Sequence, residues 1–379
     1  MKSKARVIAI YLPQYHPIPE NDEVWGKGFT EWTNVVQARP LFKGHYQPRI
    51  PKDLGFYDLR LPEIREQQAE MARNAGIEGF MYWQYYFGDN KKLLERPFEE
   101  VLKSGSPDFP FCLGWANHSW QTKTWKRDAS RKEGKTMIME QKYGGEQQYR
   151  EHFLYNLPAF KDKRYITVNG KPMFVIWNPR DHSEEIEKMI EVWRSLANEN
   201  GLPGIHFVAR QYGDDSLQWL HSLGFDAVYQ ERTLFALHKG ETKTFKSRAV
   251  NLCYRLFNIK LTLEKEDFGK AYKWLVSKEA SRTDVYPTLL AGYDRSPRAG
   301  RAAQIFYNFT PESWRKHIRD VFQYITNKEP EENIVMLKSW NEWGESNYVE
   351  PDLKYGTAFL DALKEEIQNK SGGSSTQQL

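Results

Sequence analysis

Short apolar segments alternate with helical patterns along almost the whole chain, and this alternation is the feature that most restricts its fold. The apolar segments lie at residues 7–12, 79–86, 111–116, 173–177, 206–210, 226–230, 288–292 and 335–340. Nearly continuous apolar runs are typical of strands that are buried on both faces, as in a parallel sheet. Helical periodicity appears between them, for example at residues 62–76, 183–201 and 311–328. The pattern predicts an α/β protein built as a single (β/α)8 barrel.

A doubly wound nucleotide-binding sheet would alternate in the same way. Its phosphate loops carry the patterns G-x-G-x-x-G or G-x-x-x-x-G-K-[ST], and neither occurs in this sequence. The barrel is therefore favoured.

The chain of 379 residues is long enough for one barrel with insertions. Residues 13–61 and 231–284 are too long for simple connections, and each follows a predicted strand. Loops that follow strands lie at the catalytic mouth of such barrels, so we expect both insertions there. We predict one catalytic domain at residues 1–370 and a disordered low-complexity tail at 371–379.

Composition and charge exclude several classes of protein. The 54 basic and 50 acidic residues are too balanced for a nucleic-acid-binding protein. No apolar run approaches the roughly 20 residues of a membrane span, and the first residues lack the features of a secretion signal. We therefore expect a cytoplasmic protein without an integral membrane segment. The basic segment 238–260 could contact a membrane surface peripherally or hold an anionic ligand, although a solvated lid is the simpler interpretation.

Metal and cofactor motifs are missing from the sequence. Cys112 and Cys253 lie far apart and have no neighbouring Cys or His, which predicts neither a disulfide nor a zinc site. No H-E-x-x-H or comparable spacing occurs either. We expect no metal and no cofactor.

The densest group of polar and aromatic residues follows the eighth apolar segment, at residues 340–352. Glu342 and Glu345 are three residues apart there, close enough to share one small site. Because one ionised carboxylate disfavours ionising its neighbour, such a pair supplies one acid and one base, as glycosyl chemistry requires. The alternative is an exposed loop that is rich in Glu. The neighbouring Trp, Asn and Tyr residues favour the functional interpretation.

Amides, indoles and carboxylates also follow several other predicted strands. Aromatic residues make up 15% of the chain, and their flat faces and polar edges suit sugars. We therefore predict a pocket for an oligosaccharide or polysaccharide at the barrel mouth, although for His118 alone a structural role is equally well supported. The candidate substrate-binding residues are Glu31, Trp32, Trp115, Asn117, His118, Tyr293, Asp294, Asn341, Trp343, Tyr348 and Glu350.

Four ordered motifs, at residues 11–35, 115–117, 292–298 and 340–351, resemble the WbsX family of bacterial surface-polysaccharide gene clusters. That family is related to glycoside hydrolase family 99, the endo-α-mannosidases and endo-α-mannanases. The resemblance extends from Ile8 to about Leu363. It implies a (β/α)8 barrel whose two catalytic carboxylates lie in an E-W-x-E motif, which residues 342–345 match.

By this resemblance, Glu342 removes the proton of the substrate 2-hydroxyl, and that oxygen attacks the anomeric carbon to form a 1,2-anhydro sugar. Glu345 protonates the leaving oxygen and later deprotonates water. The implied function is a retaining glycoside hydrolase that acts on an α-linked manno- or rhamno-configured bacterial polysaccharide.

The sequence departs from the family pattern at two places, which leaves the substrate open. His118 stands where relatives usually have a carboxylate, and residues 345–348 read ESNY instead of EGNH. Two other functions stay open: a glycosyltransferase or transglycosidase in O-antigen or capsular polysaccharide biosynthesis, and a glycan-binding barrel without catalysis. The absence of a D-x-D motif counts against a metal-dependent transferase, and the intact glutamate pair counts against a binding module.

Overall fold

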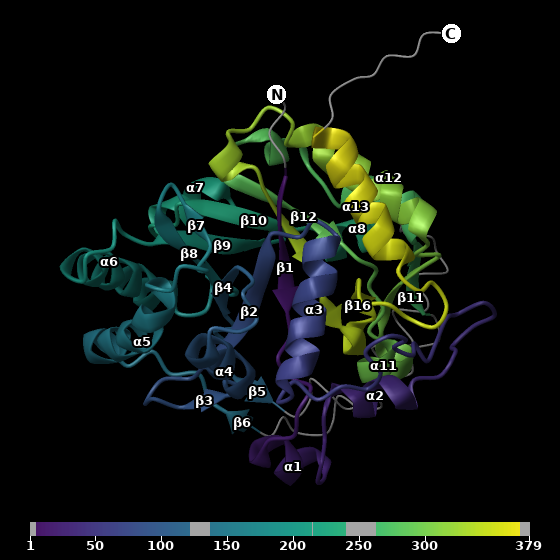
Figure 1. The fold of residues 1–379 in the computed structure, drawn as a ribbon, viewed down its shortest axis with the longest axis horizontal. Coiled ribbons are helices and arrows are strands. Elements are labelled where there is room, and N and C mark those ends of the chain that lie inside the picture. The colour runs from purple at the N-terminus through teal and green to yellow at the C-terminus, as the bar shows by residue number, and fades with distance from the viewer. Residues whose placement is uncertain (1–4, 122–136, 214, 240–262, 372–379) are drawn as a thin grey trace, which may run out of the picture.

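The computed structural model describes residues 5–121, 137–213, 215–239 and 263–371, and these form a closed parallel barrel (Figure 1). The barrel strands are β1 (Arg6–Tyr11), β2 (Gly79–Tyr86), β4 (Phe111–Trp115), β8 (Lys171–Ile176), β9 (His206–Tyr212), β10 (Ala227–Glu231), β12 (Val285–Leu290) and β14 (Ile334–Lys338). They pair in the order β1-β14-β12-β10-β9-β8-β4-β2, and β2 pairs back with β1. Each predicted apolar segment overlaps one of these strands, so the (β/α)8 prediction is confirmed.

Helices surround the barrel because each has one apolar face to bury. The longer ones are α3 (Pro62–Asn74), α4 (Arg96–Ser104), α5 (Gly145–Phe160), α6 (Ser183–Glu199), α12 (Pro311–Tyr324) and α13 (Ala358–Ser371). The predicted helices correspond to α3, α6 and α12. Thr310 forms a capping box with Ser313 at the start of α12, and Pro311 occupies its first turn, where the missing N–H costs nothing.

Shorter elements fill the connections. They are α1 (Pro19–Trp25), α2 (Glu31–Gln37), β3 (Lys92–Leu93), β5 (Trp120–Gln121), β6 (Met137–Met139), β7 (Thr167–Val168), α7 (Leu217–Ser222), α8 (Thr233–Lys239), β11 (Glu264–Asp267), α10 (Phe268–Ala271), α11 (Ser296–Ala299), β13 (Gln304–Tyr307), β15 (Asn341–Glu342) and β16 (Asn347–Tyr348). Among the residues that the structure describes, no helix is both long and apolar enough to cross a bilayer.

The first insertion, residues 13–61, packs against the segment that follows β14. Asn341 accepts a hydrogen bond from the backbone N–H of Leu12 (2.8 Å), and the Trp343 N–H donates to the Tyr15 hydroxyl (3.1 Å). Figure 1 shows α2 beside α11, and α2 also contacts the 3₁₀ turn Trp343–Glu345, which carries one of the two candidate catalytic glutamates. The insertion therefore reaches the mouth of the barrel.

The second insertion, residues 231–284, is described in part. It begins with α8 at the mouth, and β11 then pairs in parallel with β13. Most of the basic segment 238–260 and nearly all of the tail 371–379 lie outside the described residues.

Trp193 of α6 should be a main anchor of the outer helices. Its ring is fully buried beside Phe153 of α5 and Phe174 of β8, and its indole N–H donates to the carbonyl of Tyr149 (2.9 Å). Trp193→Ala should lower the free energy of unfolding by about 3–5 kcal/mol, measured by denaturant titration. The control Leu154→Ala, at a side chain 54% exposed on α5, should change it by less than about 0.5 kcal/mol. Equal effects would mean that the Trp193 packing contributes little.

Candidate active site

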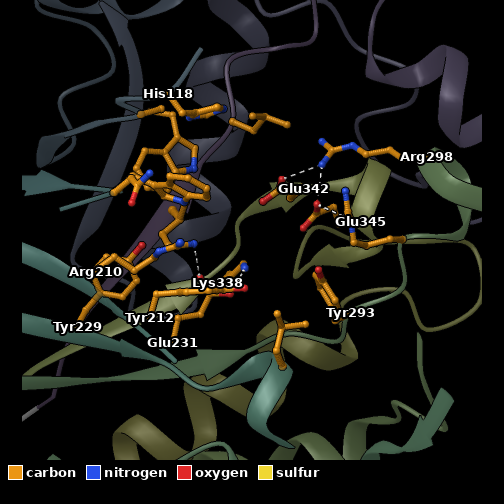
Figure 2. A pocket seen from close by; sticks show the side chains of 18 of the residues that line it. His118, Arg210, Tyr212, Tyr229, Glu231, Tyr293, Arg298, Lys338, Glu342 and Glu345 are labelled. Atoms are coloured by element: carbon orange, nitrogen blue, oxygen red, sulfur yellow. Dashed lines mark hydrogen bonds and ion pairs between the residues drawn. The ribbon is translucent and has the colours of Figure 1, made fainter. Parts of the chain in front are cut away.

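A pocket of about 610 Å³ opens where the barrel strands end (Figure 2). Seven of the eight barrel strands, or the residue just after them, contribute to its wall, from Ile10 of β1 to Lys338 of β14, and on the side of β12 the wall is formed by Tyr293 of the following loop. The volume is within the range of about 300–1,000 Å³ that is usual for small-molecule sites. The aromatic side chains in the wall are Trp83, Tyr85, Trp120, Trp177, Tyr212, Tyr229 and Tyr293.

Glu342 and Glu345 both face this pocket and both bind the Arg298 guanidinium. Arg298 Nη1 donates to Glu345 Oε1 (2.8 Å) and to Glu342 Oε1 (3.3 Å). Since one nitrogen contacts both oxygens, the two Oε1 atoms lie within about 6 Å of each other. Glu342 ends β15, and Glu345 closes the single 3₁₀ turn that follows it, so the local backbone presents both carboxyls to the pocket.

The surroundings of the two carboxyls differ. Burial and the neighbouring charge of Glu345 raise the pKa of Glu342 above its usual value. Burial also disfavours ionisation of Glu345, but Arg298, Arg295 and Lys338 outweigh this effect and hold the pKa of Glu345 below its usual value. The pair thus favours one protonated and one ionised carboxyl.

A third carboxyl, Glu31 of α2, completes the Arg298 cluster from behind. Arg298 Nε donates to Glu31 Oε2 (3.2 Å), and both side chains are almost fully buried. Burial raises the pKa of Glu31 to about 7. A Cβ atom on Gly344 would overlap Glu31 Oε2 and lie 2.8 Å from Arg298 Nε, so the residue between Trp343 and Glu345 has to be glycine.

The candidate substrate-binding residues fall into two groups. His118 and Tyr293 line the pocket with the two glutamates. The others are buried and are not among its lining residues: Glu31, Trp32, Trp115, Asn117, Asp294, Asn341, Trp343, Tyr348 and Glu350. The expectation that they share the wall with the glutamates is therefore not met by the pocket in this structure.

The buried group holds the loops of the mouth in place through hydrogen bonds to other parts of the chain. Trp115 donates to the carbonyl of Tyr86 (2.8 Å), and Asp294 accepts from His45 and Gln47 (2.7 Å each). Trp343 donates to Glu350 (2.6 Å), which also accepts from Tyr57 and Gln68. All of these contacts except that between Trp343 and Glu350 join segments that are distant in sequence.

Several lining residues carry charge that the sequence patterns did not single out. Arg295 and Arg298 lie in the 292–298 motif, and Lys338 and Glu231 stand at the last positions of β14 and β10. A charged residue at the last position of an otherwise apolar strand could have predicted Lys338 and Glu231, because the ends of barrel strands meet at the mouth.

The sequence and the fold can be compared with known proteins. Residues 7–363 match the family model described as "Glycosyltransferase WbsX". The "Uncharacterized protein WxcX" of Xanthomonas campestris pv. campestris, in strains B100 and ATCC 33913, is 31% identical over 365 residues, which cover 96% of this chain and 50% of the relative. The chain spans about half the length of these curated relatives.

Two solved structures have a similar fold over nearly their whole length. A "glycoside hydrolase-like protein" gives a TM-score of 0.61 with 14% identity, covering 96% of this chain and 94% of the other. The GH99 endo-α-mannosidase of Bacteroides thetaiotaomicron, in complex with BIS-TRIS-Propane, gives 0.58 with 13% identity and covers 97% of both chains. Identities this low support a shared fold and no more. Together with the family match, they confirm the resemblance indicated by the four motifs: the chain belongs to the WbsX family, and its barrel is similar to that of the family 99 endo-α-mannosidases.

Proposed function

We propose that the chain is a glycan-processing enzyme, a retaining glycoside hydrolase for α-linked manno- or rhamno-configured residues of a bacterial polysaccharide. The barrel and both insertions would form its catalytic domain. The observation that carries the proposal is the shared contact of Glu342 and Glu345 with one nitrogen of Arg298. Inverting enzymes need carboxyls about 6.5–9.5 Å apart to admit a water molecule on the far face of the sugar ring. The upper limit of about 6 Å disfavours that arrangement and so favours retention.

Retention would proceed through the substrate's own 2-hydroxyl, as the family resemblance implies. Glu342 takes the proton of that hydroxyl while the oxygen attacks C1, and the bond from C1 to the leaving oxygen breaks as Glu345 protonates it. Glu345 then removes a proton from water, which attacks C1 and opens the three-membered ring. Glu342 returns its proton to O2, so each carboxyl ends in its starting state.

The charges around the pocket favour the proton on the other carboxyl, Glu342. Arg298 and Arg295 favour an ionised Glu345, and the raised pKa of Glu342 favours its protonated form. One proton belongs to the pair, because the two groups interact strongly. We propose that the reactive state is the one in which this proton has moved to Glu345.

The pocket wall suits a sugar substrate. Trp83, Tyr85 and Tyr229 offer flat faces, while Asn178 and Gln304 offer hydrogen-bonding amides. The name of the family favours a second candidate, transfer of the glycosyl group to a sugar acceptor. The same anhydro intermediate would then be opened by an acceptor hydroxyl in place of water, and product analysis with and without added oligosaccharide separates the two outcomes.

Replacing either glutamate should remove most of the activity while the protein stays folded. Glu342→Gln and Glu345→Gln should each lower kcat by about 100- to 10,000-fold. A substrate with an activated leaving group needs little protonation, so it should partly restore Glu345→Gln and leave Glu342→Gln inactive. Glu184→Gln, at an exposed position on α6, serves as the matched control and should keep full activity. If the activated substrate restores Glu342→Gln but not Glu345→Gln, the assignment of acid and base to the two residues has to be exchanged.

Substrates altered at C2 test the nucleophile. If fluorine or hydrogen replaces the 2-hydroxyl, no oxygen is present to attack C1, and turnover should stop. Intact-protein mass spectrometry after incubation with the 2-fluoro sugar should find unmodified protein. A covalent adduct on Glu342 or Glu345 would falsify the anhydro-sugar route and show direct attack by a carboxylate.

The pH profile should depend on Arg295, whose Nε lies 3.2 Å from Glu345 Oε1. The rate should fall at low pH, when both carboxyls of the pair are protonated because Glu345 has also taken up a proton. It should fall at high pH, when the pair loses its one shared proton and both carboxyls are ionised. Because Arg295 lowers the pKa of Glu345, Arg295→Gln should move the acidic limb of kcat/KM to higher pH. Arg301→Gln, an exposed position in the same loop, should leave the profile unchanged. An acidic limb that stays in place would assign it to a different group.

A further inference from the structure

Beside the catalytic pair, two cations share one carboxylate in the pocket wall. Lys338 Nζ of β14 donates to Glu231 Oε1 (2.7 Å), and Arg210 Nη1 of β9 donates to Glu231 Oε2 (3.1 Å). All three side chains are at least 87% buried and line the pocket. Figure 2 shows them grouped on the side of the pocket away from Arg298. This cluster alone carries one more positive than negative charge.

Arg210 is held firmly and still has hydrogen-bonding capacity. Its guanidinium carbon lies 3.8 Å from the centre of the Trp177 ring. Its Nε is buried and has no hydrogen-bond partner among the described residues. The histidine on the same wall, His118, packs on Trp177 with ring centres 4.9 Å apart. Burial and the charge of Arg210 lower the pKa of His118 to about 4, so His118 is neutral and adds no charge to this wall.

The remaining charges of the site remove the surplus only when every carboxyl is ionised. Arg295 and Arg298 face Glu345, Glu342 and, behind the wall, Glu31. Burial favours the protonated form of both Glu342 and Glu31. Whenever either of them carries its proton, the cations outnumber the carboxylates around the pocket. Cations left uncompensated in a largely buried site are unfavourable, and an anionic ligand would relieve this.

We propose that Arg210 and Lys338 form a subsite for the carboxylate of an acidic sugar, so that the substrate residue beside the catalytic pair is a uronic acid. That the ligand is a sugar follows from the proposed function, and the inference rests on it in this respect. Arg210 supplies a planar donor group that matches a carboxylate, and Lys338 supplies a second charge nearby. Neutral wall residues such as Tyr229 and Trp177 would contact the sugar ring.

A matched pair of ligands tests the subsite without turnover. Methyl α-mannopyranoside and its 6-carboxylate, methyl α-mannopyranosiduronate, differ in the oxidation of C6 alone. The affinity of each ligand for the full chain is measured by ligand-observed NMR titration. The uronate should bind at least about tenfold more tightly, which is the gain that a charge-assisted contact provides. Mannose 6-phosphate and inorganic phosphate show whether the subsite prefers a phosphate group to a carboxylate. If either binds more tightly than the uronate, the assignment to a carboxylate is overturned.

His118 allows a variant that adds a charge without breaking an ion pair. His118→Glu adds a carboxylate to the wall that carries Arg210 and should lower the ratio of the affinity for the uronate to that for the neutral glycoside about tenfold, whatever it does to the affinity for both. His118→Gln, the neutral control, should keep the preference for the uronate. Equal losses for both ligands, or the same effect from both variants, would overturn the subsite.

The outcomes also separate this inference from the proposed function. Cleavage of neutral α-mannan oligosaccharides by a protein that shows no preference for the uronate would refute the subsite and leave the hydrolase standing. A clear preference for the uronate in a protein that cleaves no glycoside would refute the hydrolase and support the acidic subsite.

Discussion

The Arg298 guanidinium is the interaction on which the site depends, because it ties Glu31, Glu342 and Glu345 into one buried cluster. Burying a guanidinium is costly unless its hydrogen-bonding groups are paired with anions. The three carboxyls come from α2, from β15 and from the turn after β15. The cation therefore connects the first insertion to the segment that follows the last barrel strand. Gly344 leaves the space in which Glu31 and Arg298 meet.

Around this cluster, the residues of the barrel mouth fall into two sets: those that line the pocket wall and those that are buried behind it and support it. The wall presents charged and aromatic side chains from the strand ends, and the support consists of buried residues whose polar atoms bind other loops. Asp294, for example, fixes His45 and Gln47 of the first insertion against the 292–298 loop. Such paired contacts keep the catalytic carboxyls within a narrow range of positions, which acid–base chemistry requires.

The charge surplus and the protonation of the catalytic pair are linked. Lys338 lowers the pKa of both Glu342 and Glu345 and also pairs with Glu231. An anion bound beside Lys338 would weaken the stabilisation of both ionised carboxyls and so raise both pKa values. By this electrostatic argument, an acidic substrate would help the pair to keep the one proton that the proposed mechanism needs.

The sequence by itself determined the barrel, because strands buried on both faces need apolar runs and leave a local, periodic signal. It also indicated the turn that carries Glu342 and Glu345, since three-residue spacing is a local property. The tertiary structure decided which other residues face the pocket. Sequence cannot tell whether an indole such as Trp343 contacts a ligand or is buried against Tyr348, because both uses favour the same residue. The pairing of Arg298 with Glu31 joins positions 267 residues apart, and folding alone brings them together.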